Sequence, residues 1–336
     1  MRKTVTVYSG IAILFVLLIH SNAFYLHHIN SSEKFILMKA FMKVINIAVP
    51  MFVFIAGYKY ELTKKNRNIK QYFIKKVNNV IKPTIIISLI WIVVLLTLSI
   101  LKKGILGESI YIIKYLKILL YRVFNICIGN NDIYQFWYIP MYILIVFIYP
   151  IIEYYINKKN RIVLFLFLAI IQVLGSLYTN IFTKHPLDFI YYYLLFEIGI
   201  LFYKKEKSYL KKKKIICIIF TSLLLINLFI NNNFFNVIIT KLVVYPSGVI
   251  VFYYISEYIK NIKILNILGK YSFYIYVLHE PIILSTIGKI IKNLGLYKYW
   301  IWVPIISCFV ALICIYLYKL TVKFKIGQYF WNKNSY

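Results

Sequence analysis

Several chemical signatures are missing from this sequence of 336 residues. There is no P-loop, no glycine-rich dinucleotide-binding turn and no G-x-S-x-G nucleophile elbow. The absence of a phosphate cradle argues against a primary pump. The four cysteines (Cys127, Cys217, Cys308 and Cys314) lack the paired spacing of metal ligands. We therefore predict that they are small apolar packing residues, and we expect no metal site and no resident cofactor.

Acidic residues are also scarce: the chain has 10 Asp and Glu against 40 Lys and Arg, a formal net charge of +30. A charge of this size could suggest nucleic-acid binding. The basic residues, however, fall between apolar runs and do not form a soluble basic face, so we exclude nucleic acid as a partner. Isoleucine, lysine, asparagine and tyrosine are all abundant while arginine is rare, which indicates that an AT-rich genome contributes to the charge.

Apolar residues, in contrast, make up 62% of the chain, and the mean hydropathy is +0.76. Soluble domains contain about 45–50% apolar residues, so the composition indicates an integral membrane protein. The apolar runs recur along the whole chain, and the first is therefore not a removable signal peptide. We predict a single all-α transmembrane domain, residues 1–336, built as a bundle of about ten membrane-spanning helices.

The predicted spans cover residues 5–26, 38–58, 83–101, 135–156, 162–181, 187–203, 215–231, 234–255, 271–291 and 299–320. The segment Ile110–Ile128 is also apolar, but Lys114, Lys117 and Arg122 interrupt it. Because Lys114 and Lys117 lie one turn apart on one face, we predict an interfacial amphipathic helix there.

The orientation follows from the distribution of lysine and arginine between the spans. Alternate connections are densely basic, namely residues 59–82, 158–161 and 204–214, together with the tail 319–325. The other connections are poor in basic residues or carry balancing acids. We therefore expect both termini in the cytoplasm, and a multi-pass protein in the lipid bilayer of a bacterial plasma membrane.

His20 is the most informative residue, because it closes the unbroken apolar run Ile11–Ile19 near the end of the first predicted span. Ionisable groups inside a membrane are costly and commonly serve a function. On a helix, residues eleven apart share nearly the same face, so Ser9 and His20 lie on one stripe. From the residues alone two interpretations stay open: a structural histidine bonded to a backbone carbonyl, or a histidine that does chemistry.

Five stretches carry recognisable motif residues in order along the chain. They are Tyr8–Asn22 (YSGIAILFVLLIHSN), Val49–Tyr58 (VPMFVFIAGY), Phe73–Pro83 (FIKKVNNVIKP), Phe136–Pro140 (FWYIP) and Leu268–His279 (LGKYSFYIYVLH). The last stretch contains the pattern G-x-x-S…Y-x-x-H. Together the five stretches resemble the membrane acyltransferase-3 family, the integral-membrane acyltransferases of surface glycans.

The resemblance implies an enzyme that moves an acyl group, most simply acetyl from acetyl-CoA, to a hydroxyl of a cell-surface polysaccharide or a lipid-linked glycan precursor. It implies His20 as the general base, or as a transient acyl carrier, since imidazole titrates near neutral pH. Lys75, Lys76 and Asn79 would then bind the acyl-CoA donor at the cytoplasmic mouth of a water-lined cavity that contains His20. The family's usual arginines fall at Ser9, Lys76 and Asn79 here, and lysine lacks the bidentate fork of a guanidinium.

Two further ionisable residues are candidates to line the same cavity as His20 and Ser9. His279 precedes Glu280 and Pro281, and the proline is expected to free the carbonyl of Val277, four residues before it. His279 is either a carbonyl-bonded histidine at this kink or a partner that lines the cavity. Glu197 lies in an apolar run, so it either pairs with a lysine from another span or orients a histidine.

Asp132 and Trp137 are candidates to bind the acceptor, because acidic and aromatic residues together can hold sugar hydroxyls and ring faces. An aromatic belt at the membrane interface also explains the tryptophan. The serine and asparagine at two of the arginine positions keep a second hypothesis open, a non-enzymatic exporter or flippase-like component for a surface polysaccharide. A third, an accessory membrane scaffold, predicts that both histidines can be substituted.

Overall fold

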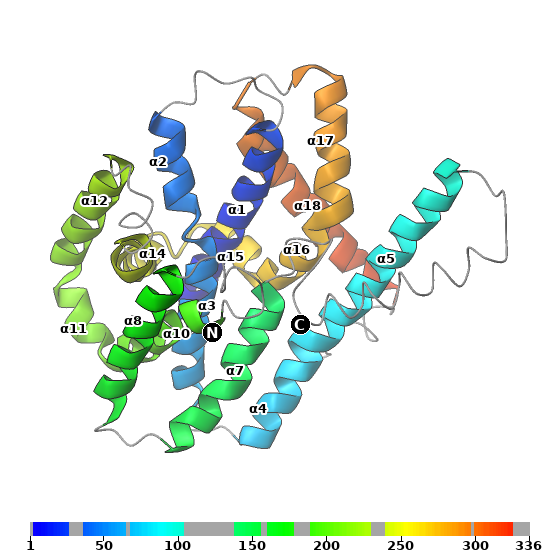
Figure 1. The fold of residues 1–336 in the computed structure, drawn as a ribbon. Coiled ribbons are helices and arrows are strands. Elements are labelled where there is room, and N and C mark those ends of the chain that lie inside the picture. Colours follow the sequence, from blue (N-terminus) through cyan, green and yellow to red (C-terminus); the bar gives the residue numbers. More distant parts are fainter. Residues whose placement is uncertain are drawn as a thin grey trace.

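The computed structural model describes residues 3–26, 36–64, 68–103, 138–155, 160–177, 189–229, 239–296 and 299–324. All regular secondary structure within these ranges is helical (Figure 1). Four of the described helices are long and apolar enough to cross a membrane: Lys3–Ala23, Phe41–Leu62, Tyr138–Tyr155 and Trp302–Lys323. The prediction of an all-α membrane protein is confirmed to this extent. The number of ten spans and the cytoplasmic termini stay predictions.

The helices have the following bounds. They are α1 (Lys3–Leu26), α2 (Ile36–Ile45), α3 (Ala48–Leu62), α4 (Ile69–Lys76), the π-helical turn η2 (Val77–Ile81), α5 (Lys82–Lys103), α7 (Tyr138–Tyr155), α8 (Arg161–Leu177), α10 (Phe189–Lys204), α11 (Glu206–Lys211), α12 (Lys213–Phe229), the π-helical turn η5 (Thr240–Val244), α14 (Tyr245–Tyr258), α15 (Lys263–Lys270), α16 (Ser272–Leu278), the π-helical turn η6 (His279–Ile283), α17 (Leu284–Asn293) and α18 (Trp302–Lys323). Each predicted span overlaps at least one of these helices. The predicted interfacial helix Ile110–Ile128 lies outside the described residues.

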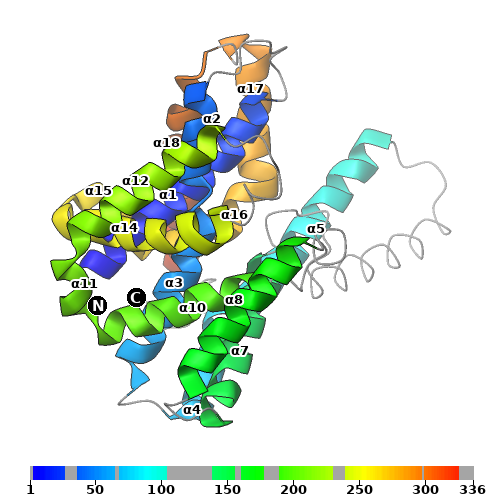
Figure 2. The same ribbon diagram turned by 60° about the vertical axis from the view of Figure 1, so that its left-hand side comes forward.

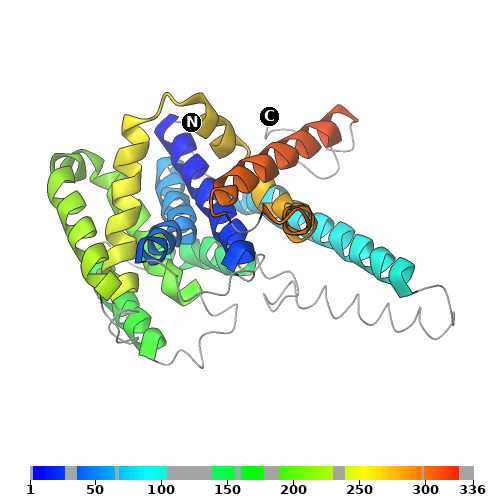
Figure 3. The same cartoon turned by 90° about the horizontal axis from the view of Figure 1, so that it is seen from above.

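The helix α1 forms the centre of the bundle. It contacts α3, α14, α15, α16 and α18, and the side chains of Val5, Val7 and Leu17 are fully buried. Seen from above, α12 and α5 lie at opposite edges with α1 between them (Figure 3). The peripheral helices α8 and α12 expose large apolar side chains such as Phe167 and Ile218. An apolar outer surface of this kind suits contact with lipid.

Two pairs of glycines let helices of the core approach very closely. A Cβ atom on Gly57 of α3 would lie 2.0 Å from the carbonyl oxygen of Phe196, and one on Gly199 of α10 would lie 2.1 Å from that of Phe54. Gly10 of α1 and Gly269 of α15 form the second pair, again each against the backbone of the other helix. Small residues at such crossings are typical of helix packing in membranes.

The early part of α18 packs against the late part of α1. The hydroxyl of Ser307, early in α18, donates to that of Ser21, late in α1, at 3.0 Å. Near the same end of α1, the indole Nε1 of Trp300 donates to the amide oxygen of Asn22 at 3.1 Å. These contacts fix the part of α1 that carries His20.

Candidate functional site

A cavity of about 800 Å³ opens between α1, α3, α4, η2, α7, α15 and α16. Its wall carries polar side chains and tyrosines from all of these elements: Thr6, Ser9, Lys59, Tyr60, Thr63, Tyr72, Lys75, Lys76, Asn79, Tyr138, Tyr142, Asn266, Lys270, Ser272, Tyr274 and Tyr276. In the second view the short helices α15 and α16 lie next to α1, with α4 and α7 below them (Figure 2). The volume is in the range of about 300–1,000 Å³ that small-molecule and cofactor sites occupy.

The cavity wall is strongly basic. Four lysines contribute to it, Lys59, Lys75, Lys76 and Lys270, while no aspartate or glutamate is among the residues described around it. Lys59 comes from the apolar helix α3, and in the described part of the chain no carboxylate forms an ion pair with it. Ammonium groups without carboxylate partners attract anions. The cavity is therefore suited to a ligand that carries several negative charges.

Local structure explains how α4 presents its lysines. The side chain of Asn68 caps the helix by accepting from the backbone amides of Lys70 at 2.9 Å and Gln71 at 3.4 Å, a common way to begin a helix. Two turns later, Lys76 donates from Nζ to the hydroxyl of Tyr142 at 2.6 Å. The helix then loosens into the π-helical turn η2, a feature that is frequent at functional sites.

The structure brings together four residues that the sequence singled out. Ser9, Lys75, Lys76 and Asn79 all line this one cavity, although Ser9 comes from α1 and the others from α4 and η2. The hydroxyl of Ser9 donates to the carbonyl of Val5, one turn earlier, at 3.1 Å. The structure thus supplies a common location for the predicted donor-binding residues, and their role in binding stays a prediction.

His20 and His279 form a pair of imidazoles close to this cavity. Their ring centroids lie 5.2 Å apart, with 55° between the ring planes. His279 is fully buried, and His20 is half-buried. Neither ring is among the residues that line the cavity. Two residues from opposite ends of the chain are thereby brought into one site.

The orientation of the His279 ring follows from two backbone contacts. Its Nδ1 lies 2.7 Å from the carbonyl oxygen of Tyr276 and 3.2 Å from that of Ile275. A carbonyl can only accept, so Nδ1 carries the hydrogen, and Nε2 of the neutral ring keeps its lone pair. This buried Nε2 has no hydrogen-bond partner among the described residues. Buried polar atoms rarely lack a partner, so Nε2 is available to a bound hydroxyl or water.

The predicted kink at Pro281 is confirmed. Glu280 adopts a non-helical conformation, with φ −129° and ψ 159°, inside the π-helical turn η6. The proline cannot donate to the carbonyl four residues earlier, and the indole Nε1 of Trp91 on α5 approaches that carbonyl, of Val277, at 3.5 Å. His279 is thus carbonyl-bonded at a kink and keeps one nitrogen open. It is not among the residues that line the cavity, and its part as a cavity partner stays a prediction.

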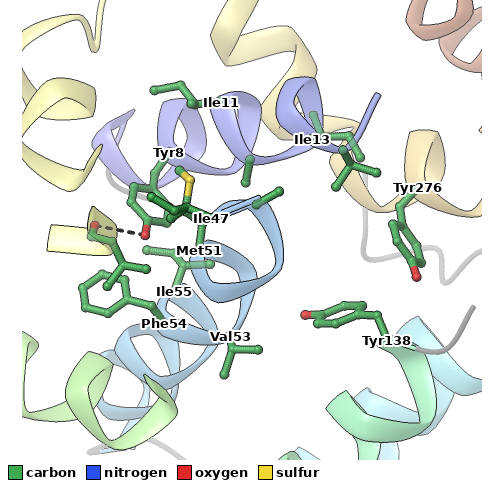
Figure 4. Close-up of a cluster of buried hydrophobic side chains, with 14 of the residues drawn as sticks. Tyr8, Ile11, Ile13, Ile47, Met51, Val53, Phe54, Ile55, Tyr138 and Tyr276 are labelled. Atoms are coloured by element: carbon green, nitrogen blue, oxygen red, sulfur yellow. Dashed lines mark hydrogen bonds between the residues drawn. The ribbon is translucent and has the colours of Figure 1, made fainter. Parts of the chain in front are cut away.

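Two tyrosines connect the basic cavity with the histidine pair. The rings of Tyr138 and Tyr276 pack edge to face with centroids 5.7 Å apart, and both residues line the cavity. Figure 4 shows the two side chains, which come from α7 and α16, beside the buried cluster around Met51 and Ile55. The Tyr276 ring in turn lies 5.9 Å from that of His279.

Glu197 lies elsewhere, in a buried ion pair. Its Oε1 is 2.5 Å from Nε of Arg161, and its Oε2 accepts from the hydroxyl of Tyr149 at 2.6 Å. Arg161 also donates to the Tyr149 hydroxyl at 2.7 Å. The carboxylate thus pairs with a cation from another helix, as one of the two sequence interpretations held, although this cation is an arginine and not a lysine. Asp132 and Trp137 lie outside the described residues.

Three further residues of the site, Lys59, Lys270 and Tyr276, have no individual role predicted from the sequence. Lys59 was counted among the basic connections, although a charge inside an apolar helix is itself a signal of function. Lys270 and Tyr276 belong to the stretch Leu268–His279, where Tyr276 is part of the motif G-x-x-S…Y-x-x-H and Lys270 is not. Their positions in the cavity wall depend on how α15 and α16 pack against α1, and spacing along the chain does not reveal this.

Comparison with known proteins gives a family match. A family model described as an acyltransferase domain matches residues 10–319, a range that includes both histidines, Lys59 and Lys270. No match was found among curated proteins or among solved structures.

Proposed function

The chain belongs to the membrane acyltransferase-3 family, and from this premise we propose that it transfers an acyl group, most simply acetyl, from a cytosolic acyl-CoA to a hydroxyl of a cell-surface polysaccharide or a lipid-linked glycan precursor. Family membership supports a membrane acyltransferase in general. The donor, the acceptor and a bacterial plasma membrane as the location are our proposal.

The basic cavity supports an acyl-CoA donor. Coenzyme A carries several phosphate charges, and each can be met by an ammonium group of Lys59, Lys75, Lys76 or Lys270. Tyrosine rings in the same wall offer faces for the planar adenine. The wall thus combines the charges and the aromatic surface that this donor requires.

In the proposed reaction His20 acts as the general base. It takes the proton of the acceptor hydroxyl while the hydroxyl oxygen attacks the thioester carbonyl. The tetrahedral intermediate then expels the thiolate of coenzyme A, to which protonated His20 returns the proton. The free Nε2 of His279 can orient the acceptor sugar by accepting a hydrogen bond from a neighbouring hydroxyl, not the one that reacts. Asp132 and Trp137 stay the predicted contacts to the acceptor sugar.

The observation that carries this proposal is a pair of imidazoles next to a lysine-lined cavity in a chain of this family. The test is mass spectrometry of cell-surface polymers from a deletion strain complemented with wild type, His20→Ala or Thr97→Ala. Thr97 is an exposed control, because its hydroxyl donates only to its own helix, at Val93.

We expect wild type and Thr97→Ala to restore the acyl mass on the polymer and His20→Ala to lose it at equal protein abundance. General acid–base catalysis contributes about 10²–10⁴-fold, so the loss is expected to be almost complete. Unchanged acylation with His20→Ala would contradict the mechanism. Polymer that accumulates inside the deletion strain would support an exporter or flippase-like component.

A further inference from the structure

Tyr138 and Tyr276 both line the cavity, and the Tyr276 ring also lies beside that of His279. They are only 8% and 6% exposed, and their rings touch edge to face across the gap between α7 and α16 (Figure 4). On one side of this contact lies the lysine-lined cavity, which both residues help to form. On the other side the Tyr276 ring leads to His279 and then to His20, at centroid distances of 5.9 and 5.2 Å.

A donor held by the lysines must therefore present its acyl end to this pair of rings. The phosphates stay with the ammonium groups, because a charged group would lose its solvation and its partners between two packed rings. The part of an acyl-CoA that can pass is its narrow, uncharged end, the thioester and the acyl chain. The space around the two rings then decides which acyl chains reach the imidazoles.

We propose that Tyr138 and Tyr276 form a constriction that selects the size of the transferred acyl group; this inference rests on the acyl transfer proposed above. The constriction admits a short acyl group when a ring turns aside, and it excludes chains with several more methylene groups. Pockets that sense one methylene discriminate by roughly 10–200-fold, so exclusion of a longer chain is expected to be at least as strong.

Substitution of Tyr276 can test the constriction without releasing His279. The imidazole is held by the backbone carbonyl of Tyr276 and not by its side chain, so replacing the side chain leaves this hydrogen bond available. Tyr276→Leu replaces the ring with a smaller side chain and so widens the constriction. Tyr276→Phe keeps the ring and is the matched control. Tyr138→Leu removes the opposite wall, and Tyr72→Leu changes a ring that lines the cavity outside the constriction.

The experiment uses membranes that contain the full chain together with its native acceptor. Release of the coenzyme A thiol is measured with acetyl-CoA, butyryl-CoA and hexanoyl-CoA, against membranes of the deletion strain. We expect wild type and Tyr276→Phe to prefer acetyl over hexanoyl by at least tenfold. Tyr276→Leu and Tyr138→Leu are expected to reduce this preference severalfold, whereas Tyr72→Leu changes the rates for all three donors alike.

Each outcome separates the two proposals. No acyl-dependent thiol release by wild type with any donor contradicts the proposed function. If wild type transfers acetyl and hexanoyl equally well, the constriction does not select and the inference is overturned, even where the leucine variants fail to accumulate. The inference is also overturned if folded Tyr276→Leu and Tyr138→Leu both keep the wild-type preference for acetyl.

Discussion

Gly10 and Gly269 lie in direct contact at the crossing of α1 and α15. A Cβ atom on Gly269 would sit 1.7 Å from the carbonyl oxygen of Thr6, and one on Gly10 would sit 2.1 Å from that of Leu265. The chain neighbours of these glycines, Ser9 and Lys270, both line the basic cavity. The close crossing therefore sets the positions of two cavity residues from distant parts of the sequence.

We predict that Gly269→Ala strongly lowers the amount of folded protein, because the new methyl group would collide with backbone atoms that cannot turn away. The expected cost is about 1–3 kcal/mol or more. The measurement is thermal unfolding of the detergent-purified protein, followed as the loss of its monodisperse elution peak.

Gly248→Ala is the matched control for this substitution. Its Cβ would approach side-chain atoms, 2.7 Å from Cδ1 of Ile47 and 2.9 Å from Cε2 of Phe220, and these can shift. We expect a smaller loss for Gly248→Ala than for Gly269→Ala. Equal losses would show that the backbone contact has no special role.

The helix positions could be predicted from the sequence because of a general constraint. In lipid, an apolar run satisfies its backbone groups within a helix, so runs such as Ile11–Ile19 fix the helix without knowledge of its neighbours. The glycine contacts could not be derived in this way. Gly10 and Gly269 lie in two different motif stretches, and the motifs do not reveal that these glycines face each other across a helix crossing.

A second prediction concerns the ion pair between Arg161 and Glu197. The carboxylate is fully buried, and removal of Arg161 would leave it without its cation. Breaking a buried pair by removing one partner costs about 3–5 kcal/mol. We expect Arg161→Met to unfold at a clearly lower temperature than wild type in detergent.

The double variant Arg161→Met with Glu197→Gln gives the control. It removes both charges, so it is expected to recover a large part of the stability that Arg161→Met loses. If the double variant is as unstable as the sum of the two single variants, the two side chains do not act as a pair.

A third prediction concerns binding of the donor. Lys59→Met and Lys76→Met each remove an ammonium group from the cavity wall. A hydrogen bond to a charged group contributes about 1.5–3 kcal/mol, so each is expected to weaken binding of coenzyme A by roughly ten- to hundredfold. Calorimetric titration of the purified protein at low and high salt measures this, and the wild-type affinity is expected to fall as salt rises.

Lys64→Met serves as the comparison for these two variants. Its Nζ lies 2.6 Å from Glu153, and the residue does not line the cavity. The variant loses one positive charge, as the others do, but is expected to bind coenzyme A like wild type. If all three variants bind equally, the charge of the molecule as a whole attracts the donor and the cavity lysines have no specific part.

The candidate site, too, could be predicted only in part from the sequence, because some of its contacts depend on how the helices pack. The intramembrane position of His20 and the carbonyl freed by Pro281 follow from local rules about lipid and about proline. The pairing of His20 with His279 depends instead on how α1 lies against η6. For the same reason the sequence could not separate the two interpretations of Glu197, whose partner Arg161 comes from a different helix.

The last prediction separates the two nitrogens of His279. Asparagine can place an amide N–H near the carbonyls that now bind Nδ1, but it offers no acceptor at the position of Nε2. We expect the free energy of unfolding of His279→Asn to lie within about 1 kcal/mol of the wild-type value, and we expect this variant to transfer the acyl group at least tenfold more slowly.

His279→Leu also loses the N–H donor, so it is expected to be both slower and less stable. Thiol release in membranes and thermal unfolding in detergent measure the two effects. Wild-type transfer by His279→Asn would show that the free lone pair has no part in the reaction, because the substitution removes it while keeping the contact that holds the side chain.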